Sequence, residues 1–242
     1  MTQSPANIRP AQTIPDCAPH PDAGATGHGD ATAPSEAAPR RRLPSAERRR
    51  EFITKAIDFF AEEGFESSTR GLARRLGVTQ PLLYRYFPSK EDLVREVYDA
   101  VFLNRWRPEW AEIIAARQTP LRARLITLYT AYTDVIFDRI WFRIYLFSGL
   151  RGIDINRQYM KLVRERMIEP IISEALANAG LPARPASEDE VEFVWTIHSG
   201  LFYFGARSLI YGAPITVDKS VVIADAVDAM MDGLGRKFRA QG

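Results

Sequence analysis

Two short helical patterns separated by a glycine lie between residues 67 and 92. The first pattern places three apolar residues on one helical face: Leu72, Ala73 and Leu76. Gly77 can end this helix because glycine adopts the left-handed conformation readily. The second pattern can begin with Thr79 as its cap and must end before Pro88. Two short helices joined by such a turn form a helix-turn-helix, which restricts the fold around this segment.

The rest of the chain from residue 44 onward also follows the period of an α-helix, and no useful strand-like alternation occurs. We expect a first helix from Pro44 or Ser45 to about Glu63 and a long helix after Ser89. Further helices are expected at about 109–116, 120–137, 139–150, 155–179, 187–211 and 217–239. Pro170 should bend the helix that contains it. The predicted fold class is all-α.

Composition divides the chain into three predicted segments. Residues 1–43 are rich in Pro, Ala, Gly and Thr and have almost no large apolar side chains. We expect them to form a disordered tail, because such a segment cannot bury enough surface to offset ordering. Residues 44–90 are predicted to form an N-terminal three-helix head with the helix-turn-helix. Residues 91–242 are predicted to form a C-terminal helical domain.

The formal net charge of +2 conceals an uneven distribution. Residues 40–107 hold 15 basic and 10 acidic side chains, whereas residues 108–242 hold 16 of each. A local excess of positive charge favours a polyanionic partner. The triplets Arg40–Arg42 and Arg48–Arg50 can form an arm along a DNA backbone or in its minor groove. They can equally be solvated charge runs, and both interpretations stay open.

Cysteine use and apolar runs indicate the compartment. Cys17 is the single cysteine, which excludes an intrachain disulfide and fits the reducing cytoplasm. The densest apolar run, 140–150, is too short for a membrane span and contains Arg143 and Ser148. The sequence has no markedly basic amphipathic helix with a wide apolar face, and this absence argues against binding to a membrane surface. We therefore expect a cytoplasmic protein without a membrane partner.

The sequence contains no pattern typical of a catalytic site. It lacks Gly-x-Ser-x-Gly, a phosphate loop, metal-ligand spacing and a paired Cys and His. The three histidines, His20, His28 and His198, do not form a metal-ligand cluster. We expect no enzymatic activity, no metal and no cofactor.

The second helix of the motif has an outward face suited to nucleic acid. Leu83 and Phe87 lie four residues apart on its inner face. The opposite surface carries Gln80, Pro81, Tyr84 and Arg85, with Leu82 at its edge. Glutamine and arginine can bind base edges, proline and leucine can touch a thymine methyl, and tyrosine hydroxyls can hold phosphate. The alternative is a helical hairpin in an unrelated α-helical protein.

Several motifs in this region share the spacing of one known family. They are Phe59–Phe65, Ser68-Thr69, Leu72-Ala73, Leu76–Val78, Leu83–Phe87 and Ser89–Leu93. On these motifs, residues 48–98 resemble the DNA-binding domain of the TetR family of bacterial transcriptional regulators. Leu82 departs from the small polar residue that many relatives have at its position.

The resemblance implies roles for individual side chains. Those expected to face bases are Arg70, Gln80, Pro81, Leu82 and Arg85. Those expected to grip phosphates are Ser68, Thr69, Tyr84, Tyr86 and Lys90. Tyr86 has the alternative role of a packing residue. The resemblance also implies a homodimer on a near-palindromic double-stranded operator, with residues 91–242 serving ligand binding and dimerisation through the last two helices.

Two aromatic segments, 139–152 and 195–212, are candidates for a ligand pocket. The candidate lining residues are Trp141, Phe142, Arg143, Tyr145, Trp195, His198 and Phe202. The alternative for these aromatics is ordinary core and subunit interface, and for His198 a satisfied core position. The aromatic content indicates a hydrophobic or amphipathic small-molecule effector.

Together these features predict a sequence-specific DNA-binding transcriptional regulator, a repressor that a small ligand releases from its operator. The alternative function is an all-α carrier or enzyme that binds a small molecule and does not bind specific DNA sequences. The outward polar face of the motif distinguishes the two, because a carrier has no use for it.

Overall fold

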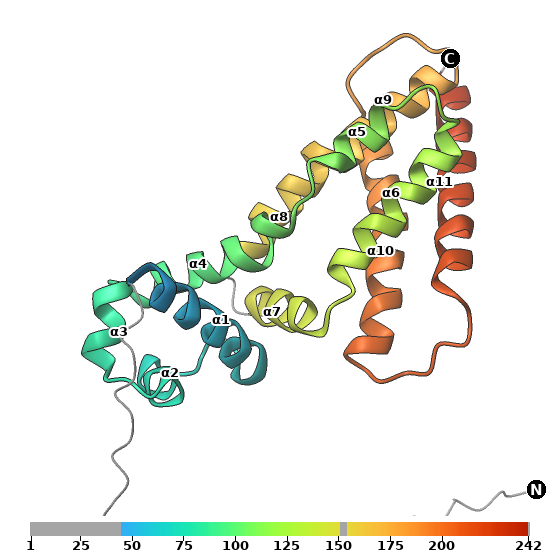
Figure 1. Cartoon of the computed structure of the whole chain (residues 1–242). Coiled ribbons are helices and arrows are strands. Elements are labelled where there is room, and N and C mark those ends of the chain that lie inside the picture. Colours follow the sequence, from blue (N-terminus) through green and yellow to red (C-terminus); the bar gives the residue numbers. More distant parts are fainter. Residues whose placement is uncertain (1–44, 151–153, 242) are drawn as a thin grey trace, which may run out of the picture. The chain divides into compact units, whose positions relative to one another are not determined.

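All regular elements of the described residues, 45–150 and 154–241 in this computed structural model, are helical, which confirms the all-α prediction (Figure 1). The tail predicted at residues 1–43 lies outside the described residues. The first four helices are α1 (Ser45–Glu63), α2 (Thr69–Leu76), α3 (Gln80–Tyr86) and α4 (Lys90–Val101). Next come the 3-10 turn η1 (Leu103–Arg105), α5 (Glu109–Ala115), α6 (Leu121–Ile136) and α7 (Arg139–Leu150). The last elements are α8 (Ile155–Val163), the π-helical turn η2 (Arg164–Ile168), α9 (Glu169–Asn178), α10 (Glu188–Leu209) and α11 (Lys219–Gln241).

Local capping explains where α2 and α4 begin and where α2 ends. Ser68 Oγ accepts a hydrogen bond from the Gly71 N–H at 3.1 Å, and Ser89 Oγ accepts one from the Asp92 N–H at 3.0 Å. Gly77 ends α2 with φ of 67°, in the left-handed region where glycine has no steric penalty. Thr79 precedes α3 but makes no side-chain capping bond.

The head, helices α1 to α3, packs on α4 around an aromatic and aliphatic core. Fully or almost fully buried members of that core are Phe52, Phe60, Phe65, Leu72, Leu83, Phe87, Leu93 and Val97. Burial of each large apolar side chain stabilises the fold by about 1.5–3 kcal/mol. This core holds α2 and α3 at their crossing and leaves the opposite face of α3 outside.

The helix expected at 155–179 is divided by the π-helical turn η2. The Glu169 N–H donates to the Arg164 carbonyl, five residues back, instead of to the residue four back. Pro170, which follows at once, has no N–H to donate to the carbonyl of Arg166. A π turn therefore lies just before Pro170, the residue at which a bend was predicted.

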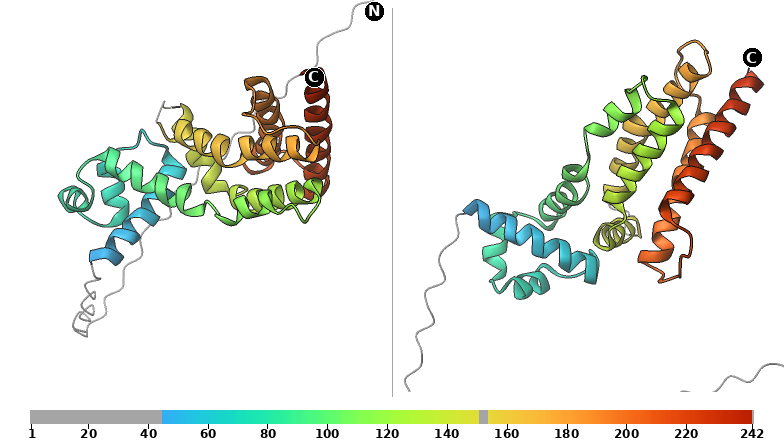
Figure 2. Two further views of the ribbon diagram at one scale, coloured as in Figure 1. Left: turned by 90° about the horizontal axis from the view of Figure 1, so that it is seen from above. Right: turned by 45° about the vertical axis from the view of Figure 1, so that its right-hand side comes forward.

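Helices α10 and α11 lie side by side along much of their length (Figure 2). α10 begins with a capping box, in which Ser187 Oγ accepts from the Glu190 N–H and Glu190 Oε2 accepts from the Ser187 N–H. In the described ranges, no helix combines the length and apolar character that crossing a bilayer requires.

Candidate DNA interface and ligand cavity

The structure separates the two faces of α3 as the helical period predicts. Leu83 is buried, while Pro81, Tyr84 and Arg85 are exposed. Gln80 and Leu82 are half-buried at the edges of the outward face. On α2, Arg70 is exposed beside that face. A polar and cationic surface of this kind can approach a nucleic acid without disturbing the core.

Three of the candidate DNA-binding side chains are hydrogen-bonded to one another. Gln80 Nε2 donates to Thr69 Oγ1 at 2.9 Å, and the Tyr84 hydroxyl shares a hydrogen bond with the same oxygen at 3.0 Å. Thr69 starts α2, so the cluster links the two helices of the motif. The second Nε2 hydrogen and the Oε1 atom of Gln80 remain available for an adenine edge. The glutamine is therefore oriented before any DNA arrives, which lowers the entropic cost of binding.

Tyr86 and Lys90 have structural contacts beside their expected phosphate roles. The Tyr86 ring is half-buried and meets Phe52 edge-on, with centroids 5.1 Å apart. Lys90 Nζ donates to the carbonyls of Phe65 at 2.5 Å and Ser67 at 3.1 Å. These bonds tie the start of α4 to the segment before α2. One ammonium hydrogen of Lys90 is left for a phosphate, and both phosphate roles stay predictions.

The arginines of the motif are divided between exposed and paired positions. Arg70, Arg74 and Arg85 are exposed, and no carboxylate pairs with them among the described residues. Arg75 instead pairs with Glu62 at 2.6 Å and lowers the pKa of that carboxyl. The unpaired guanidiniums give the outward face its positive charge, which suits phosphate and guanine.

Arg49 does not behave as part of a free basic arm. Its guanidinium donates to the Tyr86 carbonyl at 2.6 Å, pairs with Glu96 at 2.5 Å and lies over the Phe87 ring at 4.7 Å. Packing of Phe87 and Tyr86 against α1 creates this site, and no local pattern around Arg48–Arg50 indicates it. The triplet Arg40–Arg42 lies outside the described residues.

A cavity of about 240 Å³ lies between α6, α7, α8 and α10. Five of the seven candidate ligand-binding residues line it: Trp141, Tyr145, Trp195, His198 and Phe202. The other lining residues, which the aromatic segments did not indicate, are Tyr132, Tyr159, Met160, Val163 and Ser199. The first four come from α6 and α8, which lie outside the two aromatic segments, so only their packing against α7 and α10 brings them to the cavity.

Phe142 and Arg143, the other two candidates, do not line this cavity. Phe142 is fully buried behind Phe202, with ring centroids 4.8 Å apart. Arg143 points from α7 toward the end of α1, where Nε donates to the Ala61 carbonyl and Nη2 to the Glu62 carbonyl at 3.1 Å. The last carbonyls of a helix lack intrahelical partners, and a cation satisfies them well.

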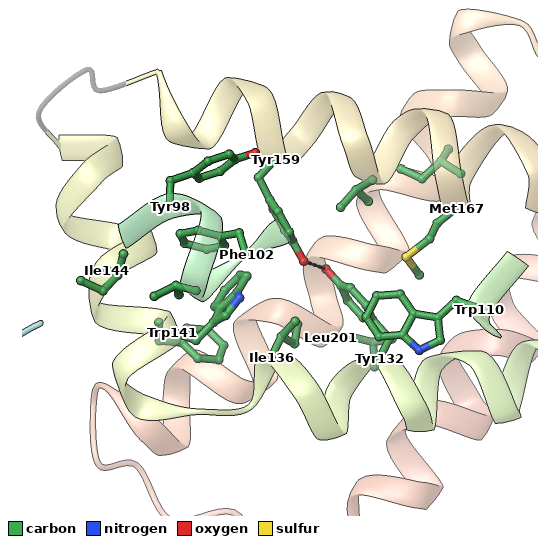
Figure 3. Close-up of a cluster of buried hydrophobic side chains, with 14 of the residues drawn as sticks. Tyr98, Phe102, Trp110, Tyr132, Ile136, Trp141, Ile144, Tyr159, Met167 and Leu201 are labelled. Carbon is green, nitrogen blue, oxygen red and sulfur yellow. Dashed lines mark hydrogen bonds between the residues drawn. The ribbon is translucent and has the colours of Figure 1, made fainter. Parts of the chain in front are cut away.

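The polar groups of the cavity form a short chain. The hydroxyls of Tyr159 and Tyr132 share a hydrogen bond at 3.0 Å (Figure 3), and Tyr132 Oη lies 3.4 Å from His198 Nε2. His198 Nδ1 is buried without a hydrogen-bond partner in the described structure. Burial lowers the pKa of His198 to about 4 and raises the pKa of Tyr132. Both groups are therefore neutral near pH 7.

No group of three or more His, Cys, Asp or Glu side chains in the described part of the chain could hold a metal ion.

Comparisons with known proteins agree with the geometry of the head. Residues 52–97 match the model of bacterial regulatory proteins of the tetR family. A comparison with curated proteins gives no match.

Solved structures share the fold of the whole helical part. A TetR family transcriptional regulator from Pseudomonas syringae pv. tomato str. DC3000 matches with a TM-score of 0.54 and 22% identity, over 77% of this chain and 95% of its own. A TetR-like transcriptional regulator from Rhodococcus sp. RHA1 matches with a TM-score of 0.54 and 19% identity, over 80% and 99%. A tetR-family regulator from Streptomyces coelicolor matches with a TM-score of 0.51 and 19% identity, over 82% and 90%. The chain thus carries a TetR-family DNA-binding domain within the fold of TetR-family transcriptional regulators.

Proposed function

We propose that this DNA-binding transcriptional regulator is a homodimeric repressor, released from a near-palindromic operator by a small ligand in the cavity. The TetR-type domain at residues 52–97 is the observation that carries the proposal. We further propose the division into a head at 44–90 and a ligand-binding and dimerisation domain at 91–242. Cytoplasmic location follows from this role, since the operator is chromosomal.

In the proposed complex, α3 enters the major groove and α2 lies beside it. Base edges would be met by Arg70, Gln80, Pro81, Leu82 and Arg85. Phosphates would be met by Ser68, Thr69, Tyr84, Tyr86 and Lys90. The hydrogen bonds from Gln80 and Tyr84 to Thr69 support this assignment, because they hold a base-reading group and a phosphate-reading group in one orientation.

We propose that dimerisation uses α10 and α11. Exposed large apolar side chains gather on and near these helices: Tyr203, Tyr211, Val217 and Val221. Of these, Tyr203 and Tyr211 are neighbours, with ring centroids 6.4 Å apart. Exposed large apolar side chains that lie together are typical of an interface. A two-fold dimer would present two α3 helices to half-sites one helical turn apart, about 34–36 Å.

Helix α7 is the proposed connection between the cavity and the head. Trp141 and Tyr145 face the cavity, while Arg143 holds the end of α1 through two carbonyls. Phe147, also on α7, lies against Gly64, where a Cβ would be 3.5 Å from its ring. A ligand that favours a different position of α7 therefore also favours a different position of α1. Only such a difference in affinity between two states can release the operator.

The proposal is tested by selecting genomic DNA fragments on the purified protein and titrating the enriched site against salt. We expect one near-palindromic site, whose binding Arg70→Ala and Gln80→Ala weaken by about 5- to 150-fold, as loss of about 1–3 kcal/mol per base contact implies. Arg75→Ala is the matched control, since Arg75 lies on the same helix but is paired with Glu62.

Absence of an enriched site, with equal weak binding to all fragments, would contradict sequence-specific regulation. Equal weakening by Arg70→Ala and Arg75→Ala would contradict the assigned face. Sedimentation of the free protein as a monomer at micromolar concentration would contradict the dimer.

A further inference from the structure

We infer that Arg49 is a positioning residue for operator binding, because it bridges the end of α3 to α1 and α4 and so fixes the outward face of α3. The inference deepens the proposed function and rests on the proposed entry of α3 into the major groove. It gives Arg49 a role through α3, in place of a direct contact between its charge and a phosphate. The contacts of Arg49 with Tyr86, Phe87 and Glu96 are called the Arg49 bridge below.

Helix α3 has little stability of its own. It has only 7 residues, and an isolated helix shorter than about 12–15 residues is marginal in water. Thr79 makes no side-chain capping bond at its start. At its end the chain leaves in an extended conformation at Phe87, without a left-handed glycine, and Pro88 has no N–H for the Tyr84 carbonyl. Contacts with other helices must therefore hold α3 in place.

Arg49 of α1 supplies such a contact at the end of α3. Its Nη1 donates to the Tyr86 carbonyl at 2.6 Å, and its guanidinium lies over the Phe87 ring at 4.7 Å. The last carbonyls of a helix lack intrahelical partners and carry partial negative charge, so a cation bound there stabilises the helix end. Phe52, three residues further along α1, meets the Tyr86 ring edge-on at 5.1 Å. Arg49 and Phe52 therefore hold the same end of α3 from one face of α1.

Glu96 of α4 orients the guanidinium at this position. Arg49 Nη2 is 2.5 Å from Glu96 Oε1, while Nη1 serves the Tyr86 carbonyl. The planar fork of arginine can bind two acceptors in different directions at once, whereas the ammonium of lysine is a compact point charge. Three helices, α1, α3 and α4, therefore meet at one side chain.

The Arg49 bridge acts on the DNA-binding face through the last turn of α3. Tyr84 and Arg85, both on the outward face, directly precede Tyr86. Tyr84 also shares a hydrogen bond with Thr69 of α2 at 3.0 Å, so α3 is held from α2 as well as from α1. Hydrogen bonds to base edges require distances of about 2.7–3.2 Å, whereas attraction to phosphate acts over a longer range. Loss of the bridge should therefore weaken binding of the operator more than binding of other DNA.

The first test compares Arg49→Met with Arg50→Met in the full-length protein. Both variants remove one positive charge, and Arg50 is exposed without a carboxylate partner in the described part of the chain. We expect Arg49→Met to weaken operator binding by about tenfold, as loss of one charge-assisted hydrogen bond implies, and to leave the salt dependence of binding unchanged. A lost phosphate contact has a different signature. It reduces the slope of log K against log salt concentration by about 0.9 and weakens binding to all DNA alike.

Two further variants separate geometry from charge. Arg49→Lys keeps the charge but not the fork, so it should also weaken operator binding. Glu96→Ala makes the head more positive and would strengthen DNA binding by electrostatics alone. We expect it instead to weaken operator binding by about two- to fivefold, because Arg49 loses its partner. Glu91→Ala is the matched control on the same helix, since Glu91 is exposed without an ion pair among the described residues, and it should not weaken binding.

Hydrogen exchange of the α3 amides tests the bridge without DNA. Arg49→Met should speed exchange at residues 83–87 by about tenfold, because a helix end that has lost its contact opens more often. Arg50→Met should leave this exchange unchanged.

Unchanged exchange in Arg49→Met would overturn the inference, and so would a reduced salt slope, since Arg49 would then contact phosphate. An operator that Arg49→Met binds as tightly as the unmodified protein does would refute the inference and leave the regulator intact. Faster exchange in Arg49→Met, with no enriched operator for the unmodified protein, would support the bridge and refute the proposed function.

Discussion

Replacing Glu174 with glutamine should cost the protein a large part of its stability. Glu174 on α9 receives Arg124 of α6, with Nη1 2.9 Å from Oε2, and Arg117, with Nη2 2.8 Å from Oε1. The side chains of Glu174 and Arg124 are only 11% and 6% exposed, and Arg124 Nη1 also donates to the Ile114 carbonyl. The carboxylate therefore balances a guanidinium that is almost enclosed.

The magnitude follows from the charge that remains. Glutamine keeps the shape of the side chain but removes its charge, and arginine cannot lose its proton to compensate. Breaking one partner of a buried pair costs about 3–5 kcal/mol, against a total folding stability of about 5–15 kcal/mol. Because the side chain of Arg117 is 67% exposed, water reaches one edge of the site. We expect the lower end, about 3 kcal/mol.

Urea unfolding at one fixed protein concentration measures the effect. Asp228→Asn is the matched control, since Arg122 also binds Asp228 through two bonds, at 2.6 and 2.8 Å, but both side chains are about half exposed. Water screens an exposed pair, so the control should shift the midpoint far less. Equal shifts for the two variants would refute the argument that burial decides the strength of these pairs.

Three further predictions concern stability and coupling. Burial lowers the pKa of His198 to about 4 in the folded protein, so between pH 6.5 and pH 4 the unfolded chain binds a proton at this residue that the folded protein does not. The free energy of unfolding should therefore fall by about 1.4 kcal/mol for each pH unit below 6.5, down toward pH 4. Thermal unfolding of His198→Phe should lack this slope. Gly233→Ala should lower the free energy of chemical unfolding by about 1–3 kcal/mol, because the new Cβ would lie 2.0 Å from the Phe193 ring. Gly200→Ala is the control. Its Cβ would meet no atom within 4 Å, so it should not destabilise the monomer fold. Arg143→Met should lower the free energy of unfolding by about 1–3 kcal/mol in chemical unfolding, because the last carbonyls of α1 lose their charged donor. An unchanged free energy would exclude these bonds as a tie between α7 and α1.

Helix boundaries and the faces of α3 could be predicted from the sequence because their causes are local. A serine cap, a left-handed glycine and the apolar period act within a few residues, so Ser68, Gly77 and Leu83 lie where expected. The motif spacing of the head is local in the same sense, and it led to the TetR resemblance that the family match confirms. Five of the seven candidate ligand-binding residues line one cavity, and their segments are unusually aromatic; their role in ligand binding stays a prediction.

Contacts between distant segments could not be predicted in this way. Arg143 looked like a ligand-binding cation because its neighbours are apolar, yet it satisfies carbonyls 81 and 82 positions away in the chain. Arg49 looked like part of a basic run and is held by Glu96 and Phe87. A long cationic side chain binds whichever acceptors the folded chain brings within reach, and its own sequence neighbours do not specify them.

By itself, the sequence determined an all-α chain with a helix-turn-helix whose outward face is polar and basic, because periodicity and capping are encoded residue by residue. Tertiary structure alone decided that Tyr132 and Tyr159 join His198 in one cavity and that α7 connects this cavity to α1. The physical reason is that helix packing sets which side chains meet across more than 20 residues of chain, and the enclosed groups then change their protonation and partners with burial.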